Sequence, residues 1–223
     1  MRATRSPPTK WAIALVITAV AVAISYQWLD RPIAYFSHAN FHNDPLFAKL
    51  TLIPEAFAPL AVLAFVVLGL RALMEKPLTR LEAVTLLCAL SLVIGSAIKN
   101  QLKIVFGRTW PETWVRNNPS LIQDGVYGFN PFQTGAAFES FPSGHTTAVV
   151  AVMSVLWLCY PRFRIVYAAV IAAVVIGLIG ADFHFLSDCI AGAFIGASTG
   201  WIVVTLWESG GRVPVSADGG KRS

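Results

Sequence analysis

Residues Pro142, Ser143, Gly144 and His145 precede an apolar run and combine the features of an anion-binding site with a proton donor. Gly144 lets a ligand approach the backbone, and the first amide groups of a following helix would point at a bound anion. Ser143 adds a hydroxyl donor, and His145 can give a proton to a departing oxygen. The alternative is an ordinary helix start, in which Ser143 is the N-cap and His145 is an interfacial residue.

A second candidate group is the pair His184 and Asp188, which are four residues apart and therefore share a face of a helical turn. Asp188 directly precedes an apolar run, and a carboxylate at the edge of an apolar segment has a desolvation cost and usually has a partner or a function. If Asp188 holds one imidazole nitrogen, it fixes the tautomer of His184 and leaves the other nitrogen as a nucleophile or base. The alternative is a structural contact that closes the turn between two helices.

Two cations, Lys103 and Arg108, precede the Pro142 segment. An arginine suits bidentate contact with phosphate oxygens, and a lysine acts as a compact point charge. The alternative is that both side chains extend to lipid headgroups. Together with the two histidine segments, these cations predict a site for a phosphate ester.

The elements that must position these residues are membrane helices. The chain has 223 residues, of which 56% are hydrophobic and 13% charged, and this is too apolar for a soluble domain. Six apolar runs approach the roughly 20 residues that a membrane-crossing helix needs. They cover residues 11–29, 55–73, 82–98, 146–160, 165–180 and 189–207. We therefore predict an all-α, polytopic membrane helical bundle of six transmembrane helices, with one domain at 1–208 and a short flexible cytoplasmic tail at 209–223.

The basic residues indicate the orientation of the bundle. Most of the 17 lysines and arginines fall at alternate turns, and loops rich in such residues face the cytoplasm. Both termini are then cytoplasmic, and nucleic acid is not an expected partner despite the net charge of +5. The opposite set of loops contains residues 103–111, 142–145 and 184–188. Charge bias and hydropathy thus predict that all three segments lie on one outward side of the membrane.

His38 and His42 are also four residues apart, with Asp44 nearby, and could face one way as metal ligands. No second group of ligands is evident in the other outward loops beyond the residues already used. An interfacial loop also accommodates histidine readily. We therefore predict no metal ligands in this protein.

At the candidate residues the sequence resembles the type 2 phosphatidic acid phosphatase superfamily, which includes bacterial membrane phosphatases of lipid A and of other lipid phosphates. Its signature is Lys, six residues and Arg-Pro; then Pro-Ser-Gly-His; then Ser-Arg, five residues, His, three residues and Asp. This chain matches the second part in full from Pro142 to His145, and the third at His184 and Asp188. The resemblance covers residues 99–196.

The resemblance implies an integral membrane lipid phosphatase that works through a phosphohistidine. His184 would attack phosphorus, Asp188 would orient His184, and His145 would protonate the leaving group. The scheme needs no metal or other cofactor, and its partner is a lipid phosphate or pyrophosphate in the membrane. We expect the site at the periplasmic face of a bacterial inner membrane.

Both motif arginines are absent at their expected positions. Counting from Lys103, the first falls on Trp110; counting back from His184, the second falls on Leu178. The family site uses the lysine and both arginines to neutralise the phosphate in its transition state. This chain is therefore expected to supply part of that charge from elsewhere.

Arg108 stands two places before the motif position, a rotation of about 200° on a regular helix. A turn at Gly107 would have to aim it at the phosphate, and Arg116 is a weaker candidate from the same loop. The sequence leaves three hypotheses open: an active lipid phosphatase with a rearranged pocket, a transferase that moves phosphate between lipids, and a catalytically silent lipid-binding relative. A fourth, outside the family, is a small transporter that uses Lys99, Asp182 and Asp188.

Overall fold

The computed structural model describes residues 8–74, 77–114, 117–210 and 215. In this part of the chain the regular structure is helical, with only isolated β-bridges between loop residues. Its long helices are α1 (Pro8–Ile24), α4 (Phe57–Leu73), α5 (Arg80–Phe106), α7 (Gly144–Cys159), α8 (Arg164–Gly180) and α9 (Leu186–Ser209). Each of the six apolar runs thus forms a helix, which confirms the prediction of an all-α membrane fold.

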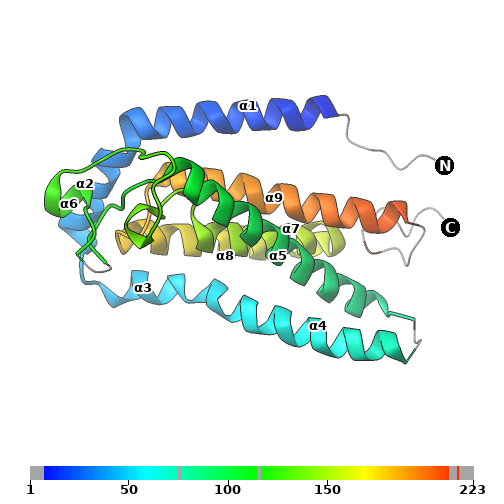
Figure 1. Cartoon of the computed structure of the whole chain (residues 1–223). Coiled ribbons are helices and arrows are strands. Elements are labelled where there is room, and N and C mark those ends of the chain that lie inside the picture. The colour runs from blue at the N-terminus through cyan, green and yellow to red at the C-terminus, as the bar shows by residue number, and fades with distance from the viewer. Residues whose placement is uncertain (1–7, 75–76, 115–116, 211–214, 216–223) are drawn as a thin grey trace.

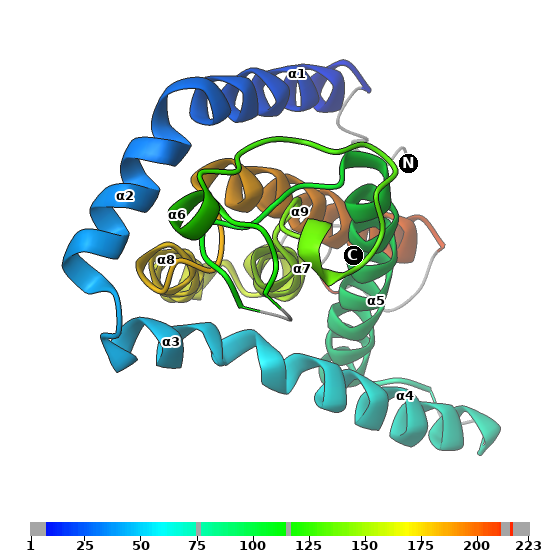
Figure 2. The same cartoon turned by 60° about the vertical axis from the view of Figure 1, so that its left-hand side comes forward.

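The first two spans are extended by shorter helices that hydropathy alone did not predict. A π-helical turn (Ser25–Leu29) leads from α1 into α2 (Asp30–Phe41). A short helix α3 (Pro45–Thr51) and a 3₁₀ turn (Ile53–Ala56) lead into α4. Figure 2 shows α2 and α3 as a strap that passes around the ends of α8 and α7. The segment between the first two spans is therefore a structural element and not a loose loop.

Within the described residues, five helical stretches are long and apolar enough to cross a membrane: Thr9–Phe41, Pro45–Arg71, Arg80–Phe106, Pro161–Gly180 and Leu186–Ser209. The sixth predicted span, α7, has 16 residues and a length of about 24 Å, which is less than the roughly 30 Å of a hydrocarbon core. It lies in the middle of the bundle, packed against α9, α5 and α8 (Figure 2). The count of six spans stays a prediction.

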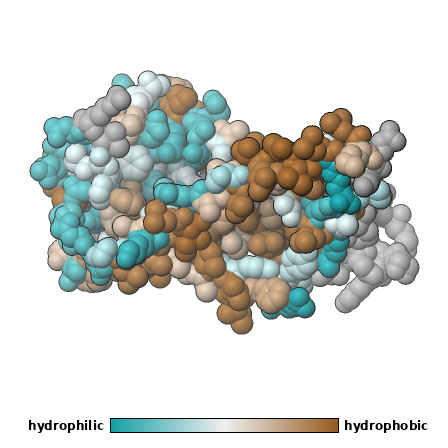
Figure 3. Space-filling view, turned by 90° about the horizontal axis from the view of Figure 1, so that it is seen from below, coloured by the Kyte–Doolittle hydropathy of each residue, from teal (hydrophilic) through white to brown (hydrophobic). Residues whose placement is uncertain are grey.

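The two ends of the bundle differ in character. α1 begins and α9 ends at the same end, while α2, α6 (Leu121–Asp124) and the loop that follows α5 gather at the other (Figure 1). Brown apolar side chains cover much of the flank behind the polar loop end (Figure 3). Exposed apolar residues such as Val16, Leu63 and Ile165 are stable there because lipid tails, not water, surround a transmembrane flank. The cytoplasmic position of the termini stays a prediction from the charge bias.

Close packing of α7 against α9 depends on glycine in α9. A Cβ on Gly196 would lie 2.7 Å from the amide nitrogen of Ala151 and 2.7 Å from the carbonyl oxygen of Thr147. Small residues of this kind let membrane helices approach closely. The contact fixes α7, and therefore its first turn, against the helix that carries Asp188.

Gly196→Ala is expected to destabilise the protein by on the order of 1–3 kcal/mol, because the added methyl group meets backbone atoms that cannot move aside. Gly69→Ala in α4 is the matched control, since a Cβ there meets nothing within 4 Å. Thermal unfolding in detergent measures both variants. Equal melting temperatures for the two would contradict the close α7–α9 contact.

The loop between α5 and α7 is folded over the polar end of the bundle. It contains α6 and a 3₁₀ turn (Ala136–Phe138), and isolated bridges join Arg108 to Phe129 and Trp110 to Ser120. Gly107 takes a left-handed conformation (φ 55°), and this turn separates Arg108 from the axis of α5. Of the predicted flexible tail, residues 211–214 and 216–223 lie outside the described part; Val215 is buried.

Candidate active site

The first turn of α7 forms the floor of the site. Ser143 is the N-cap: its hydroxyl is buried and accepts hydrogen bonds from the amide (3.3 Å) and hydroxyl (3.0 Å) of Thr146. The amides of Gly144 and His145 belong to the first turn of α7, where a helix offers no acceptor of its own. Because free amides and the helix dipole favour an anion, this turn can hold a phosphate. Both of the bonds from Thr146 use the Ser143 hydroxyl as an acceptor, so its contact with substrate through its own proton stays a prediction.

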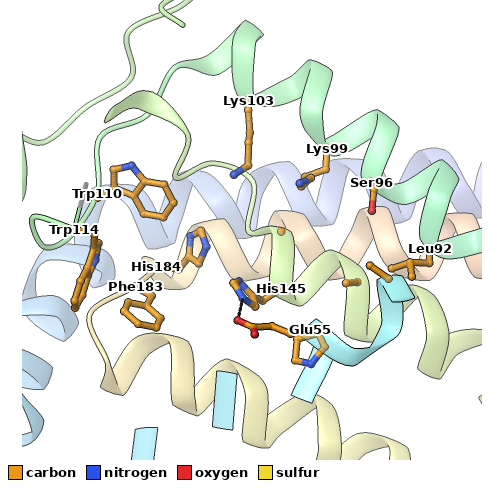
Figure 4. A pocket seen from close by; sticks show the side chains of 14 residues that line it. Glu55, Leu92, Ser96, Lys99, Lys103, Trp110, Trp114, His145, Phe183 and His184 are labelled. Carbon is orange, nitrogen blue, oxygen red and sulfur yellow. Dashed lines mark ion pairs between the residues drawn. The ribbon is translucent and has the colours of Figure 1, made fainter. Parts of the chain in front are cut away.

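A cavity of about 460 Å³ opens above this turn. Lys99 and Lys103, one helical turn apart on α5, both extend into it (Figure 4). A Cβ on Gly144 would lie only 3.4 Å from the ammonium nitrogen of Lys99, so that cation stands directly over the start of α7. The sequence predicted Lys103 as a substrate-binding residue but assigned Lys99 only to a transporter. The spacing of four residues between them was the signal that could have revealed the pair.

His184 lies in the turn between α8 and α9, opposite the two lysines (Figure 4). Its amide donates a hydrogen bond to the carbonyl of Leu178 at 3.2 Å, which ties the turn to the end of α8. Its side chain is 3% exposed and lines the cavity. Its ring centroid lies 6.5 Å from that of His145 and 5.1 Å from that of Trp110. The structure therefore brings the two predicted catalytic histidines together.

Asp188, in the first turn of α9, is completely buried behind His184. Its Oδ2 lies 3.3 Å from Nδ1 of His184 and accepts hydrogen bonds from the Ser140 hydroxyl (2.7 Å) and the Phe185 amide (3.0 Å). Its Oδ1 accepts from Arg108 at 2.5 Å. A carboxylate held this firmly fixes the imidazole tautomer with the proton on Nδ1 and leaves Nε2 for the cavity.

Arg108 does not contact the cavity, so the structure does not support its prediction as a substrate-binding residue. Its guanidinium is completely buried and bridges two carboxylates, donating to Asp188 and, at 2.7 Å, to Asp30. The turn at Gly107 aims it inward instead of toward the phosphate. Its carbon Cζ lies 4.3–5.2 Å from the ring centroids of Tyr26, Tyr127, Phe129 and Phe185.

Asp30 is the residue of this network that sequence reasoning missed. It is 1% exposed, at the start of α2, and accepts hydrogen bonds from Arg108, from the Ser187 amide (3.0 Å) and from the Tyr127 hydroxyl (3.2 Å). The signal was available, because an acidic residue at the end of an apolar run needs a partner. Its partner lies 78 positions away and could not be deduced from the sequence.

Burial and the neighbouring charges shift the pKa of both Arg108 and His184. Burial alone would lower the pKa of Arg108, but Asp188 and Asp30 hold it above its ordinary value. Burial also lowers the pKa of His184, and the nearby charges of Lys103 and Arg108 add to this effect. The hydrogen bond that His184 donates to Asp188, and the charge of Asp188, oppose it only in part. The imidazole of His184 is therefore neutral at neutral pH, with a free lone pair on Nε2.

The two positions where the family signature has arginine differ from each other. Trp110 lines the cavity, and the ammonium nitrogen of Lys103 lies 5.6 Å from its ring centroid. Leu178 is completely buried in an apolar cluster with Val149, Val174 and Cys189. Neither position supplies charge. Among the described residues that line the cavity, the positive side chains are Lys99 and Lys103, and the α7 turn adds its helix dipole. Arg116, the weaker candidate for a replacement, lies outside the described residues.

His145 has a carboxylate neighbour that the sequence analysis did not assign. Its Nε2 lies 3.9 Å from Oε1 of Glu55, which projects from the 3₁₀ turn before α4 (Figure 4). The His145 side chain is 35% exposed, in contrast to the enclosed His184. One histidine is thus held rigidly by a buried carboxylate and the other is open to the cavity, an arrangement suited to a nucleophile and a proton donor.

The sequence of this chain is similar to those of known proteins. A model of the PAP2 superfamily matches residues 84–211. Lipid A 1-phosphatase from Rhizobium etli is 29% identical over 207 residues, covering 87% of this chain and 83% of that protein. Lipid A 1-phosphatase from Rhizobium johnstonii is 31% identical over 207 residues, covering 86% of this chain and 78% of that protein.

The fold is also that of a solved structure. A transmembrane PAP2-type phosphatidylglycerolphosphate phosphatase from Bacillus subtilis aligns with a TM-score of 0.61 and 20% identity, covering 91% of this chain and 96% of that one. At this identity the likeness shows the shared fold. Since the family model matches more than half of its residues, this chain belongs to the PAP2 superfamily.

Proposed function

We propose that this membrane protein is a lipid phosphatase that hydrolyses a phosphate or pyrophosphate monoester through a phosphohistidine, at the periplasmic face of a bacterial inner membrane. The observation that carries the proposal is the arrangement of His184, with Nδ1 3.3 Å from Oδ2 of Asp188 and its ring in the wall of the cavity. Basic residues such as Arg80 and Arg164 lie at the other ends of α5 and α8, away from the site. Because basic ends of membrane helices face the cytoplasm, this supports an outward position of the site.

In the proposed reaction the phosphate lies over the first turn of α7, beneath Lys99 and Lys103. Nε2 of His184 donates its lone pair to phosphorus, and the bond between phosphorus and the lipid oxygen breaks. His145 gives a proton to that oxygen. A water molecule, which loses a proton to His145, then attacks the phosphohistidine and releases inorganic phosphate. No metal or other cofactor takes part.

Positive charge for the transition state comes from the lysines and the helix terminus in this scheme. A compact ammonium over a helix N-terminus stabilises an anion without the bidentate geometry of arginine. This explains how the chain can bind phosphate with Trp110 and Leu178 at the motif positions.

A lipid substrate is supported by the apolar side of the cavity. Beyond the charged groups, its wall toward α4 consists of Pro54, Ala58, Leu92 and Ala148, and it lies beside an apolar flank. An acyl chain fits this side because it exchanges one apolar environment for another. Since two relatives are lipid A 1-phosphatases, lipid A is the first substrate to test.

The test is phosphate release by the purified chain in detergent from lipid A, phosphatidate and prenyl pyrophosphate. Free phosphate from at least one of them is the expected result. Phosphorylated acceptor lipid without free phosphate would replace the proposal with a transferase. Binding of all three without turnover would replace it with a silent relative, and solute uptake by reconstituted vesicles would indicate a transporter.

A further inference from the structure

We propose a structural divalent-metal site, suited to Zn²⁺, formed by His38, His42, Glu112 and Asp182. These residues come from three segments: the end of α2 with its C-cap residue His42, the loop after α5, and the α8–α9 turn. This goes beyond the proposed reaction, which uses no metal, and it departs from the expectation that the chain contains no metal ligands. Asp44, the third residue considered from the sequence, is not part of the group, since its side chain accepts a hydrogen bond from the Leu46 amide at 2.9 Å.

Three of the distances between the candidate ligand atoms are close to those around a tetrahedral ion. Zinc bonds to nitrogen and carboxylate oxygen are about 2.0–2.1 Å, so neighbouring ligand atoms around it are about 3.3 Å apart. Nδ1 of His38 lies 2.9 Å from Oδ2 of Asp182 and 3.2 Å from Oε2 of Glu112. Nδ1 of His42 lies 3.6 Å from the same Asp182 oxygen. Each residue offers one ligand atom, and these atoms all lie within 4.8 Å of one another.

The charge of the group also requires a cation. Asp182 is 1% exposed and Glu112 is 8% exposed, and in the described part of the chain their ion-pair partners are these histidines alone. Oδ1 of Asp182 is buried without a hydrogen-bond partner. Burying two carboxylates together is costly unless their charge is neutralised, and one divalent ion neutralises both.

Hydrogen bonds alone explain this group less well. Nδ1 of His38 carries at most one proton and can satisfy only one carboxylate fully, yet it lies within 3.2 Å of both Asp182 and Glu112. The rings of His38 and His42 lie 4.1 Å apart, so both side chains approach the same point beside the carboxylates. Neutral histidines that share a metal ion with two carboxylates account for all four positions.

An ion can reach the group from outside. A cavity of about 210 Å³ lies beside it, lined by His42, Asp44, Trp114 and Phe183 among others. The side chain of His42 is 38% exposed. A structural site with one accessible ligand can therefore load after the chain has folded.

The position of the group suggests its role. Asp182 is two residues before His184, and its carbonyl accepts a hydrogen bond from the Trp114 indole at 3.3 Å. Trp114 and Phe183 line the active-site cavity, with ring centroids 4.5 Å apart. A metal ion here would fasten α2 and the loop to the turn that carries His184, and so position that histidine without touching the substrate.

Metal content tests the proposal directly. The tag-free full-length chain, purified in detergent, would be stripped with chelator, incubated with Zn²⁺ and desalted. We expect about one zinc per chain and a higher melting temperature than in chelator. With Co²⁺ in place of zinc, we expect the strong visible absorption of a four-coordinate ion. A wild-type chain that retains no metal, with the same melting temperature in zinc and in chelator, would overturn the proposal.

The double variant His38→Gln and His42→Gln should retain no zinc, and zinc should not shift its melting temperature. Asp44→Asn and His145→Gln are the matched controls, since they change a nearby carboxylate and another histidine; both should retain one zinc. Zinc retained equally by the double variant would also overturn the proposal, because the ion would then bind elsewhere. These readouts do not depend on phosphate release, so the metal site and the proposed function can fail separately.

Discussion

Replacement of His184 by glutamine is expected to lower phosphate release from the lipid substrate by on the order of 10⁴-fold to 10⁶-fold. Glutamine keeps a similar volume and a polar end near Asp188, but it has no nucleophilic nitrogen. In the proposed reaction the other described histidine of the cavity, His145, acts on the leaving oxygen and does not attack phosphorus. The rate of phosphate release at saturating substrate measures the effect.

A matched comparison distinguishes the nucleophile from the proton donor. His145→Gln is expected to lower the rate less, on the order of 10²-fold to 10⁴-fold, since it removes general acid catalysis and leaves the attacking nitrogen. The wild-type protein quenched during turnover should carry phosphate in an acid-labile, base-stable linkage, and the His184→Gln protein should carry none. A His184→Gln protein with more than about one hundredth of the wild-type rate would contradict the assignment.

Arg108→Met should produce the largest loss of stability in the chain, about 3–5 kcal/mol. Methionine fits among the aromatic rings, but Asp30 and Asp188 would lose the charge that both contact. An isolated buried carboxylate is strongly unfavourable, and Asp188 would also hold His184 less firmly. Thermal or chemical unfolding in detergent measures the first effect, and phosphate release measures the second.

A second substitution tests whether the loss of stability comes from the two buried carboxylates that Arg108 neutralises. Asp30→Asn combined with Arg108→Met removes one of the two unpaired charges, so the double variant should be more stable than the sum of the single effects predicts. If Arg108 instead contacted phosphate, Arg108→Met would raise KM and leave the melting temperature unchanged. That result, or strictly additive effects of the two substitutions, would contradict the buried network.

Much of the fold could be predicted because its strongest signal is local. A membrane helix satisfies its own backbone hydrogen bonds, so a long apolar run is sufficient to indicate it. The six predicted runs correspond to α1, α4, α5, α7, α8 and α9. The helix α2 was not predicted, because its stability depends on distant contacts such as the 2.7 Å hydrogen bond from the Ser37 hydroxyl to the carbonyl of Ile179.

The sequence by itself indicated the helices, their common polar end, and the candidate site residues His145, His184 and Asp188. These follow from composition and from spacings of a few residues, which constrain neighbouring backbone whatever the rest of the chain does. Only the tertiary structure decided the direction of Arg108 and the grouping of His38 with Asp182. Each depends on partners far away in the chain, 78 residues from Arg108 to Asp30 and 144 from His38 to Asp182. A buried charge is stabilised by whatever packing brings to it, and sequence spacing does not specify that packing.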